Sequence, residues 1–206
     1  MESSVQNRES VVYLNDPPLT VRLHPVIEMS DDQLYEFAGI NRELRIERNS
    51  QGELIFMAPA GGGTSDRNAE ITMQVRIWSK SDGTGRSFDS SGGFRLPNGA
   101  VRSPDASWIR KSRLGSLSDE QIEKFIPLCP DFVIELRSPS DSLSVLKAKM
   151  QEYLDNGLQL GFLLDPEQRR VYLYRPGMPV EELDDPDTVS GEPILSGFVL
   201  NLREIW

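Results

Sequence analysis

The sequence contains a single cysteine, Cys129, and a single histidine, His24. One cysteine cannot form a disulfide within the chain, which suits the reducing environment of the cytoplasm. One histidine argues against a zinc site built from several histidines and against a Ser-His-Asp catalytic triad. Carboxylates and lysines must therefore carry any chemistry that the chain performs.

Long apolar stretches are also missing. No run approaches about 20 consecutive apolar residues, the length needed to cross a bilayer, so we expect no membrane-spanning helix. The first residues show neither the basic nor the apolar region of a secretory signal, and we expect a cytoplasmic protein. The chain has 206 residues, 38% hydrophobic and 26% charged, which is typical of globular proteins. We expect an extended arm over residues 1–29 and a single domain over residues 30–206.

Basic residues are outnumbered by acidic ones. The chain has 22 Lys and Arg against 32 Asp and Glu, a net charge of −10. This balance argues against a protein that coats nucleic acid without specificity, because such binding needs a basic surface. It leaves open a localised basic groove, or a carboxylate site whose charge is offset by bound Mg²⁺.

The first half of the chain predicts a helix, a hairpin and a longer helix. Ser30 followed by Gln33 three residues later is a capping-box pattern that begins a short helix. Residues 44–47 and 53–57 alternate apolar with polar around a turn, which predicts a β-hairpin. A helix is then expected to run to about Lys80. Its N-cap would be Thr64 or Ser65, and its buried stripe would comprise Ala69, Met73 and Ile77.

Glu70 borders that expected stripe, where an acid is costly unless it has a partner. The partner could be a bound cation. Glu70 could equally be a rim glutamate that pairs with Arg67 or Gln74, and periodicity alone does not separate the two interpretations.

The second half predicts a sheet with acids inside its strands. Residues 106–109 read as a strand preceded by Asp105, and residues 132–136 form the most strand-like segment, apolar on both faces apart from Glu135. A strand of that kind belongs at the centre of a sheet covered on two sides. A helix to about Asn156 follows, carrying Lys147 and Lys149 on opposite flanks of its apolar face. Further strands over residues 160–164 and 171–174 complete one mixed α/β (α+β) domain.

Asp105 and Glu135 can meet if their strands are neighbours, which their closeness in sequence favours. Two adjacent carboxylates repel each other unless a divalent cation lies between them, and Mg²⁺ takes one or two carboxylates without needing histidine. Such an ion can polarise a phosphodiester, and a neighbouring ammonium can stabilise the developing charge. The pattern therefore indicates a metal-dependent hydrolytic site of the kind found in nucleases.

Several segments resemble the Uma-two family, bacterial restriction-endonuclease-like proteins of the broad PD-(D/E)XK class. The similarity spans roughly residues 30–206, and residues 104–165 are its specific part. The matching segments are R-E-L-R-I-E (42–47), G-E-L-I-F-M (52–57), R-N-A-E-I (67–71), P-D-A-S-W-I (104–109), P-D-F-V-I-E-L-R-S-P-S-D-S-L (130–143), K-M-Q-E-Y-L-D-N-G (149–157), L-G-F-L-L-D-P (160–166) and G-F-V-L-N-L-R-E-I-W (197–206).

The resemblance implies a central mixed β-sheet flanked by helices, with an N-terminal β-hairpin extension, and a site for Mg²⁺ or Mn²⁺. By position it implies Glu70, Asp105 and Glu135 as metal ligands and catalytic acids, with Lys149 as the catalytic lysine. The PD-(D/E)XK pattern has lysine two residues after Glu135, where this chain has Arg137. Arginine does not lose its proton in proteins, so Arg137 could clamp a phosphate but not act as a base.

The leading hypothesis is thus a Mg²⁺- or Mn²⁺-dependent endonuclease acting on DNA. A binding or regulatory module that retains the fold without turnover is the main alternative, favoured by Arg137 and by the charge of −10. Hydrolysis of a small phosphate ester is a third. The apolar strands and the hairpin could support a homodimer, which duplex cleavage would make convenient.

Overall fold

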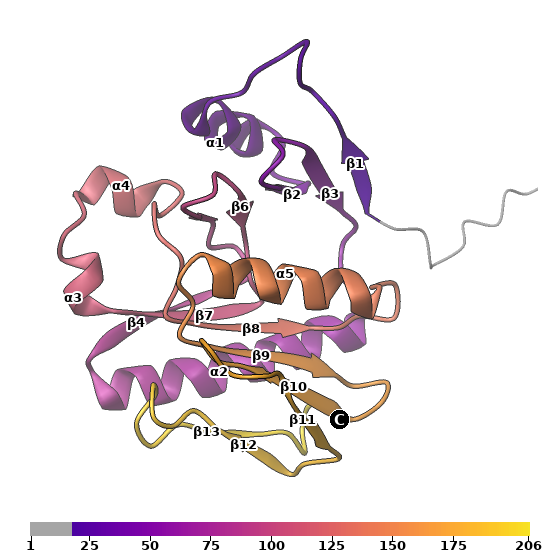
Figure 1. Cartoon of the computed structure of the whole chain (residues 1–206), viewed down its shortest axis with the longest axis vertical. Helices are drawn as coiled ribbons and strands as arrows, with labels where there is room; N and C mark the ends of the chain where they lie inside the picture. The colour runs from indigo at the N-terminus through magenta and orange to yellow at the C-terminus, as the bar shows by residue number, and fades with distance from the viewer. Residues whose placement is uncertain (1–17) are drawn as a thin grey trace, which may run out of the picture.

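The computed structural model describes residues 18–206 and is organised around a six-stranded sheet (Figure 1). Its strands lie in the order β11-β10-β9-β8-β7-β4. β8 and β9 run parallel and the other neighbours are antiparallel, so the sheet is mixed, as predicted. The strands are β4 (Gly85–Asp89), β7 (Ala106–Arg110), β8 (Phe132–Leu136), β9 (Leu160–Asp165), β10 (Arg170–Tyr174) and β11 (Glu181–Asp184).

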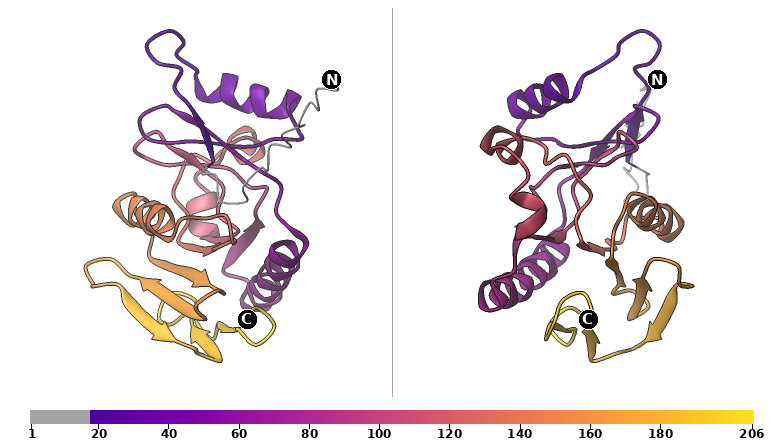
Figure 2. Two further views of the ribbon diagram at one scale, coloured as in Figure 1. Left: turned by 90° about the vertical axis from the view of Figure 1, so that its right-hand side faces the viewer. Right: turned by 60° about the vertical axis from the view of Figure 1, so that its left-hand side comes forward.

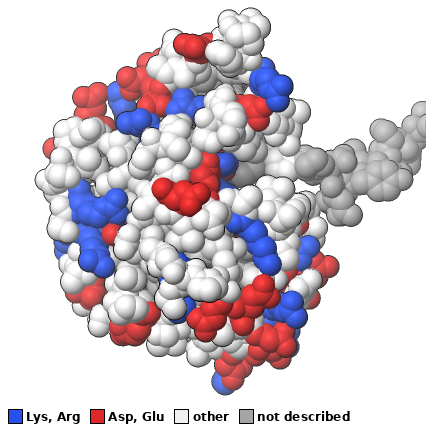
Figure 3. Space-filling model, viewed as in Figure 1, with Lys and Arg blue, Asp and Glu red and all other residues white. Residues whose placement is uncertain are grey.

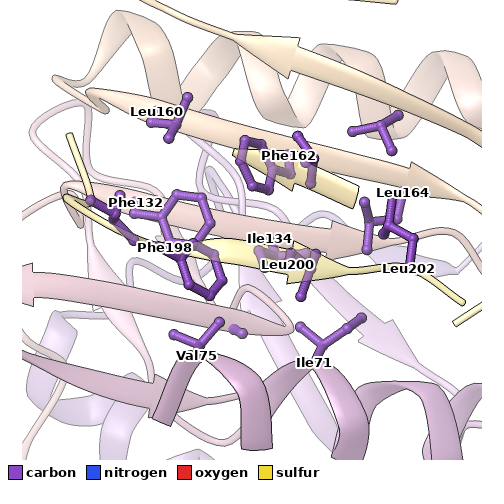
Figure 4. Close-up of a cluster of buried hydrophobic side chains, with 14 of the residues drawn as sticks. Ile71, Val75, Phe132, Ile134, Leu160, Phe162, Leu164, Phe198, Leu200 and Leu202 are labelled. Atoms are coloured by element: carbon purple, nitrogen blue, oxygen red, sulfur yellow. The ribbon is translucent and has the colours of Figure 1, made fainter. Parts of the chain in front are cut away.

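Two helices cover opposite faces of this sheet, α2 (Gly62–Asp82) and α5 (Leu143–Asp155). Because side chains alternate along a strand, β8 contributes to two separate cores. Phe132 and Ile134 pack with Ile71 and Val75 of α2 (Figure 4). Val133 packs with side chains of α5 on the other face, among them Met150. Residues 132–136 are all buried, which confirms the prediction of a central strand covered on both sides.

A second, smaller sheet lies at the N-terminal end of the molecule (Figure 2). Its antiparallel strands lie in the order β1-β3-β2-β6-β5. β2 and β3 form the predicted hairpin, and β1 from the N-terminal arm pairs with β3. Residues 1–17 of the expected arm lie outside the described residues. The strands are β1 (Leu19–Val21), β2 (Arg45–Arg48), β3 (Leu54–Met57), β5 (Phe94–Arg95) and β6 (Val101–Arg102).

The remaining elements are short. α1 (Asp31–Ile40) begins with the predicted capping box of Ser30 and Gln33. α3 (Lys111–Leu114) and α4 (Asp119–Glu123) lie between β7 and β8, and β12 (Thr188–Ser190) pairs with β13 (Val199–Asn201). Among residues 18–206, no helix combines the length and apolar character that crossing a membrane requires.

The predicted start and buried stripe of the long helix were wrong. α2 begins at Gly62 with Gly61 at its N-cap, before the expected N-cap residues. Its buried apolar residues are Ile71 and Val75, whereas Met73 and Ile77 of the expected stripe are 48% and 62% exposed. Both pairs have the same four-residue spacing, so periodicity could not decide which face meets the sheet.

Candidate active site

Strands β7 and β8 bring Asp105 and Glu135 side by side. The two strands pair antiparallel with Ala106 opposite Ile134, and continuing that register by one residue places Asp105 opposite Glu135. Oδ2 of Asp105 accepts a hydrogen bond from the backbone N–H of Leu136 at 2.8 Å. Asp105 is 6% exposed and Glu135 is 3% exposed. The two carboxylates, 30 positions apart in sequence, therefore share one enclosed region on the α5 face of the sheet.

Helix α5 places an ammonium group in that region. Nζ of Lys149 lies 2.8 Å from Oε1 of Glu135, and the hydroxyl of Tyr153 donates to the same oxygen at 3.0 Å. Lys147 points elsewhere: its Nζ lies 3.5 Å from Glu182 and 3.9 Å from the centre of the Tyr172 ring. The structure thus separates two lysines that the helical pattern left equivalent.

A third carboxylate, Glu47 of β2, was not predicted as part of this site. Its Oε1 lies 2.9 Å from Nζ of Lys149 and accepts from the backbone N–H of Ser103 at 2.9 Å. Its Oε2 accepts from Arg102 at 3.0 Å, and Arg102 also donates to Glu152 at 2.6 Å. The available signal was an acid in the R-I-E-R strand of the hairpin, and alternation alone does not mark it as part of a site.

Two further side chains flank Asp105. Nδ2 of Asn68 donates to Oδ1 of Asp105 at 3.2 Å, and Nη1 of Arg45 lies 3.5 Å from the same oxygen. Nη2 of Arg45 donates to the backbone carbonyl of Ser103 at 2.7 Å. Asn68 comes from α2 and Arg45 from β2, so both the long helix and the smaller sheet reach the carboxylate pair.

Glu70, the acid expected from α2, is not brought into this group. It is half-buried and accepts a hydrogen bond from Nε2 of Gln74 at 2.8 Å, the second of the two interpretations that its position allowed. Within residues 18–206, no hydrogen bond or ion pair connects Glu70 with Asp105, Glu135 or Lys149. The residue of α2 that contacts Asp105 lies two positions earlier, at Asn68.

Arg137 is occupied by carboxylates of its own. Its Nη1 lies 3.1 and 2.9 Å from the two oxygens of Asp165 and 2.8 Å from Glu167. Asp165 is fully buried, and its Oδ1 also accepts backbone N–H groups of the turn that follows β9. Arg137 therefore neutralises a buried acid at the end of β9, which would otherwise carry an uncompensated charge.

The charges of the site shift one another's ionisation. Burial raises the pKa of Glu135 to about 7, with the negative charges of Asp105 and Glu47 adding to the effect and Lys149 opposing it. Burial also disfavours ionised Glu47, but Lys149 and Arg102 more than offset it and lower the pKa of Glu47 to about 2. Burial works against the Lys149 ammonium as well, yet Glu135 and Glu47 raise its pKa. Lys149 is thus a cation at neutral pH, and Glu135 is the acid whose charge changes near neutrality.

The donor set fits a hard divalent cation with few protein ligands. Among the described residues, no three His, Cys, Asp or Glu side chains are grouped to hold a metal ion. Mg²⁺, however, usually takes only one or two carboxylates and keeps several waters, and Mn²⁺ also prefers oxygen ligands. Asp105 and Glu135 supply two carboxylates, and Oδ1 of Asn68 is a buried oxygen without a hydrogen-bond partner in this part of the chain. These three oxygen donors suit Mg²⁺ or Mn²⁺ better than Zn²⁺.

The sequence also matches the model of a known family. The family model of Uma2, described as "Putative restriction endonuclease", matches residues 31–203. The chain belongs to the Uma2 family. This confirms the resemblance drawn from the sequence motifs, and it places residues of both sheets within the matched region.

A solved structure shows the same nuclease-like arrangement. It is described as a putative nuclease belonging to DUF820 from Anabaena variabilis ATCC 29413. The two chains are 25% identical and superpose with a TM-score of 0.67, over 78% of this chain and 88% of the other. A search of curated proteins gave no match. Membership of this chain in the Uma2 family is therefore established, as is its mixed sheet flanked by helices.

Proposed function

We propose that this member of the Uma2 family is a Mg²⁺- or Mn²⁺-dependent endonuclease that hydrolyses phosphodiester bonds in DNA. The observation that carries the proposal is the position of Asp105 beside Glu135, where it accepts a hydrogen bond from the N–H of Leu136, with the Lys149 ammonium 2.8 Å from Glu135. Membership in a family of the restriction-endonuclease kind and the likeness to a nuclease structure support it.

In this proposal, Asp105 and Glu135 would hold the metal ion, with Asn68 as an additional oxygen donor. When bound, such an ion stabilises negative charge on a phosphodiester and activates water. Lys149 keeps its proton, so it would act as a positive charge next to the reacting phosphate rather than as a base. Tyr153 fixes the orientation of Glu135 through its hydrogen bond at 3.0 Å.

Cleavage of labelled duplex and single-stranded DNA tests this proposal, with Mg²⁺, Mn²⁺ or EDTA present. The wild type should cleave only with metal. Asp105→Asn and Lys149→Met should lower the cleavage rate by about 100-fold or more, the usual cost of losing one group that stabilises developing charge. Lys147→Met is the matched control, because it removes a lysine of the same helix that faces Glu182. Equal rates in Asp105→Asn and the wild type would reject the site.

A binding or regulatory module without turnover is the alternative. It is favoured by the way Lys149 is shared between Glu47 and Glu135, and by the occupation of Arg137 by Asp165. Acidic and basic side chains are also interspersed over the face seen in Figure 3, rather than gathered in one long basic tract.

Titration with Mn²⁺ separates the nuclease from the module without turnover. A metal ion present at a concentration of 100 times its Kd for the folded state stabilises that state by about 2.7 kcal/mol. An unchanged melting temperature in Mn²⁺ would therefore favour the module.

A further inference from the structure

Arg45 of β2 carries a hydrogen-bond donor that nothing in the described chain accepts. Its Nη2 donates to the carbonyl of Ser103 at 2.7 Å, whereas its Nε is buried and has no partner among residues 18–206. Its side chain is 34% exposed, so part of the side chain borders solvent while Nε does not. A buried donor left without an acceptor is costly, and native proteins rarely tolerate one away from a functional site.

Neighbouring arginines do not share this feature. Arg102 is held by Glu47 and Glu152, and Arg137 by Asp165 and Glu167, with distances between 2.6 and 3.1 Å. Each of these guanidinium groups compensates a buried carboxylate, Glu47 for Arg102 and Asp165 for Arg137. Neither can turn to a ligand without leaving an acid unpaired.

The contact of Arg45 with Asp105 is looser. Its Nη1 lies 3.5 Å from Oδ1 of Asp105, beyond the usual range of a strong N–H···O bond. On the same oxygen of Asp105 lies Asn68, whose own Oδ1 also has no hydrogen-bond partner among the described residues. The unused donor of Arg45 and the unused acceptor of Asn68 thus flank the carboxylate of Asp105. Negative oxygens of a ligand would accept from the first, and a water bound with that ligand would donate to the second.

We infer that Arg45, and not Arg137, contacts a phosphate group of the nucleic acid bound at this site. The inference rests on the proposed nuclease function. A guanidinium presents parallel N–H groups that match two phosphate oxygens, and it stays charged at every working pH. Arg45 comes from the N-terminal hairpin, so this assigns the smaller sheet a direct part in holding the substrate.

The salt dependence of DNA binding tests the inference. Binding of a fluorescein-labelled 20-base-pair duplex is followed by anisotropy in EDTA, which withholds the metal ion and prevents cleavage. Each phosphate contact contributes a slope of about 0.9 to the fall of log K with log salt concentration, so Arg45→Ala should flatten the slope by about that amount and weaken binding roughly tenfold at low salt. Arg22→Ala is the matched control, because it removes the same charge from the 78%-exposed Arg22.

Arg45→Lys provides a second measurement, which distinguishes a phosphate contact from a purely structural role of Arg45. Lysine keeps the charge but loses the fork, so the salt slope should return to that of the wild type while affinity stays reduced. Melting curves of all variants establish that they are folded. An Arg45→Ala slope equal to that of Arg22→Ala would overturn the inference, even if the wild type binds and cleaves DNA. A wild type that neither binds nor cleaves would overturn the proposed function, and the inference with it.

Discussion

Nζ of Lys149 lies 2.9 Å from Oε1 of Glu47, a residue 102 positions earlier in the chain. This ion pair joins β2 of the smaller sheet to α5 on the central sheet. The two side chains are 11% and 3% exposed. A buried ion pair is stable only while both charges are matched, because an unmatched ion retains its desolvation cost. The placement of the ammonium beside Glu135 therefore depends on an acid from outside the central sheet.

The first prediction concerns this acid. Glu47→Gln should reduce the free energy of unfolding by about 3 kcal/mol, because it leaves Lys149 and Arg102 each with one fewer carboxylate in a buried setting. Urea unfolding followed by fluorescence measures the loss. Glu53→Gln, on the same hairpin but paired with the exposed Arg22, should leave the midpoint nearly unchanged. Equal effects of the two substitutions would mean that the Glu47 network does not stabilise the fold.

The second prediction is the pH dependence of the same contribution. The pKa of Glu47 is lowered to about 2, below the ordinary value of about 4.3, so the folded state favours the ionised form. Its contribution is fully present above the ordinary pKa and is lost as pH falls toward 2. The difference in unfolding free energy between the wild type and Glu47→Gln should therefore shrink as pH falls from about 5 toward 2. A constant difference over that range would contradict the assigned pKa.

Much of the central sheet could be predicted, because its signals are local. Residues 132–136 are apolar on both faces, and Glu135 stood out as an acid within them. Glu47 was not predicted as part of the site, because its partners Arg102 and Lys149 lie 55 and 102 positions away and no local pattern encodes such contacts. The same holds for Arg45 and Asn68, which only the packing of β2 and α2 brings to Asp105. Local patterns thus identified the strands, whereas the surrounding network depends on tertiary packing.

The third prediction uses the single cysteine as a reporter of α5. Burial raises the pKa of the Cys129 thiol to about 12, and its Sγ donates to the backbone carbonyl of Tyr153 at 3.5 Å. At pH 8 the thiolate fraction should be roughly one in ten thousand, so alkylation by iodoacetamide should be very slow in the folded protein and fast in urea. Mass spectrometry over time measures this difference. Rapid labelling of the native protein would show that α5 opens readily.

The fourth prediction compares the two acids that the sequence assigned to metal binding from different elements. Asp105→Asn should lower the rate of Mn²⁺-dependent cleavage by about 100-fold or more, because Asp105 lies beside Glu135, where it accepts from the N–H of Leu136. Glu70→Gln should lower the rate by less than about tenfold, since its carboxylate is bound by Gln74 and a neutral amide can keep that contact. Single-turnover rates over a series of Mn²⁺ concentrations provide the comparison. An equal loss in both variants would mean that Glu70 leaves Gln74 when metal binds. The site would then hold three acids, and the arrangement in which Glu70 is bound by Gln74 would be its resting state.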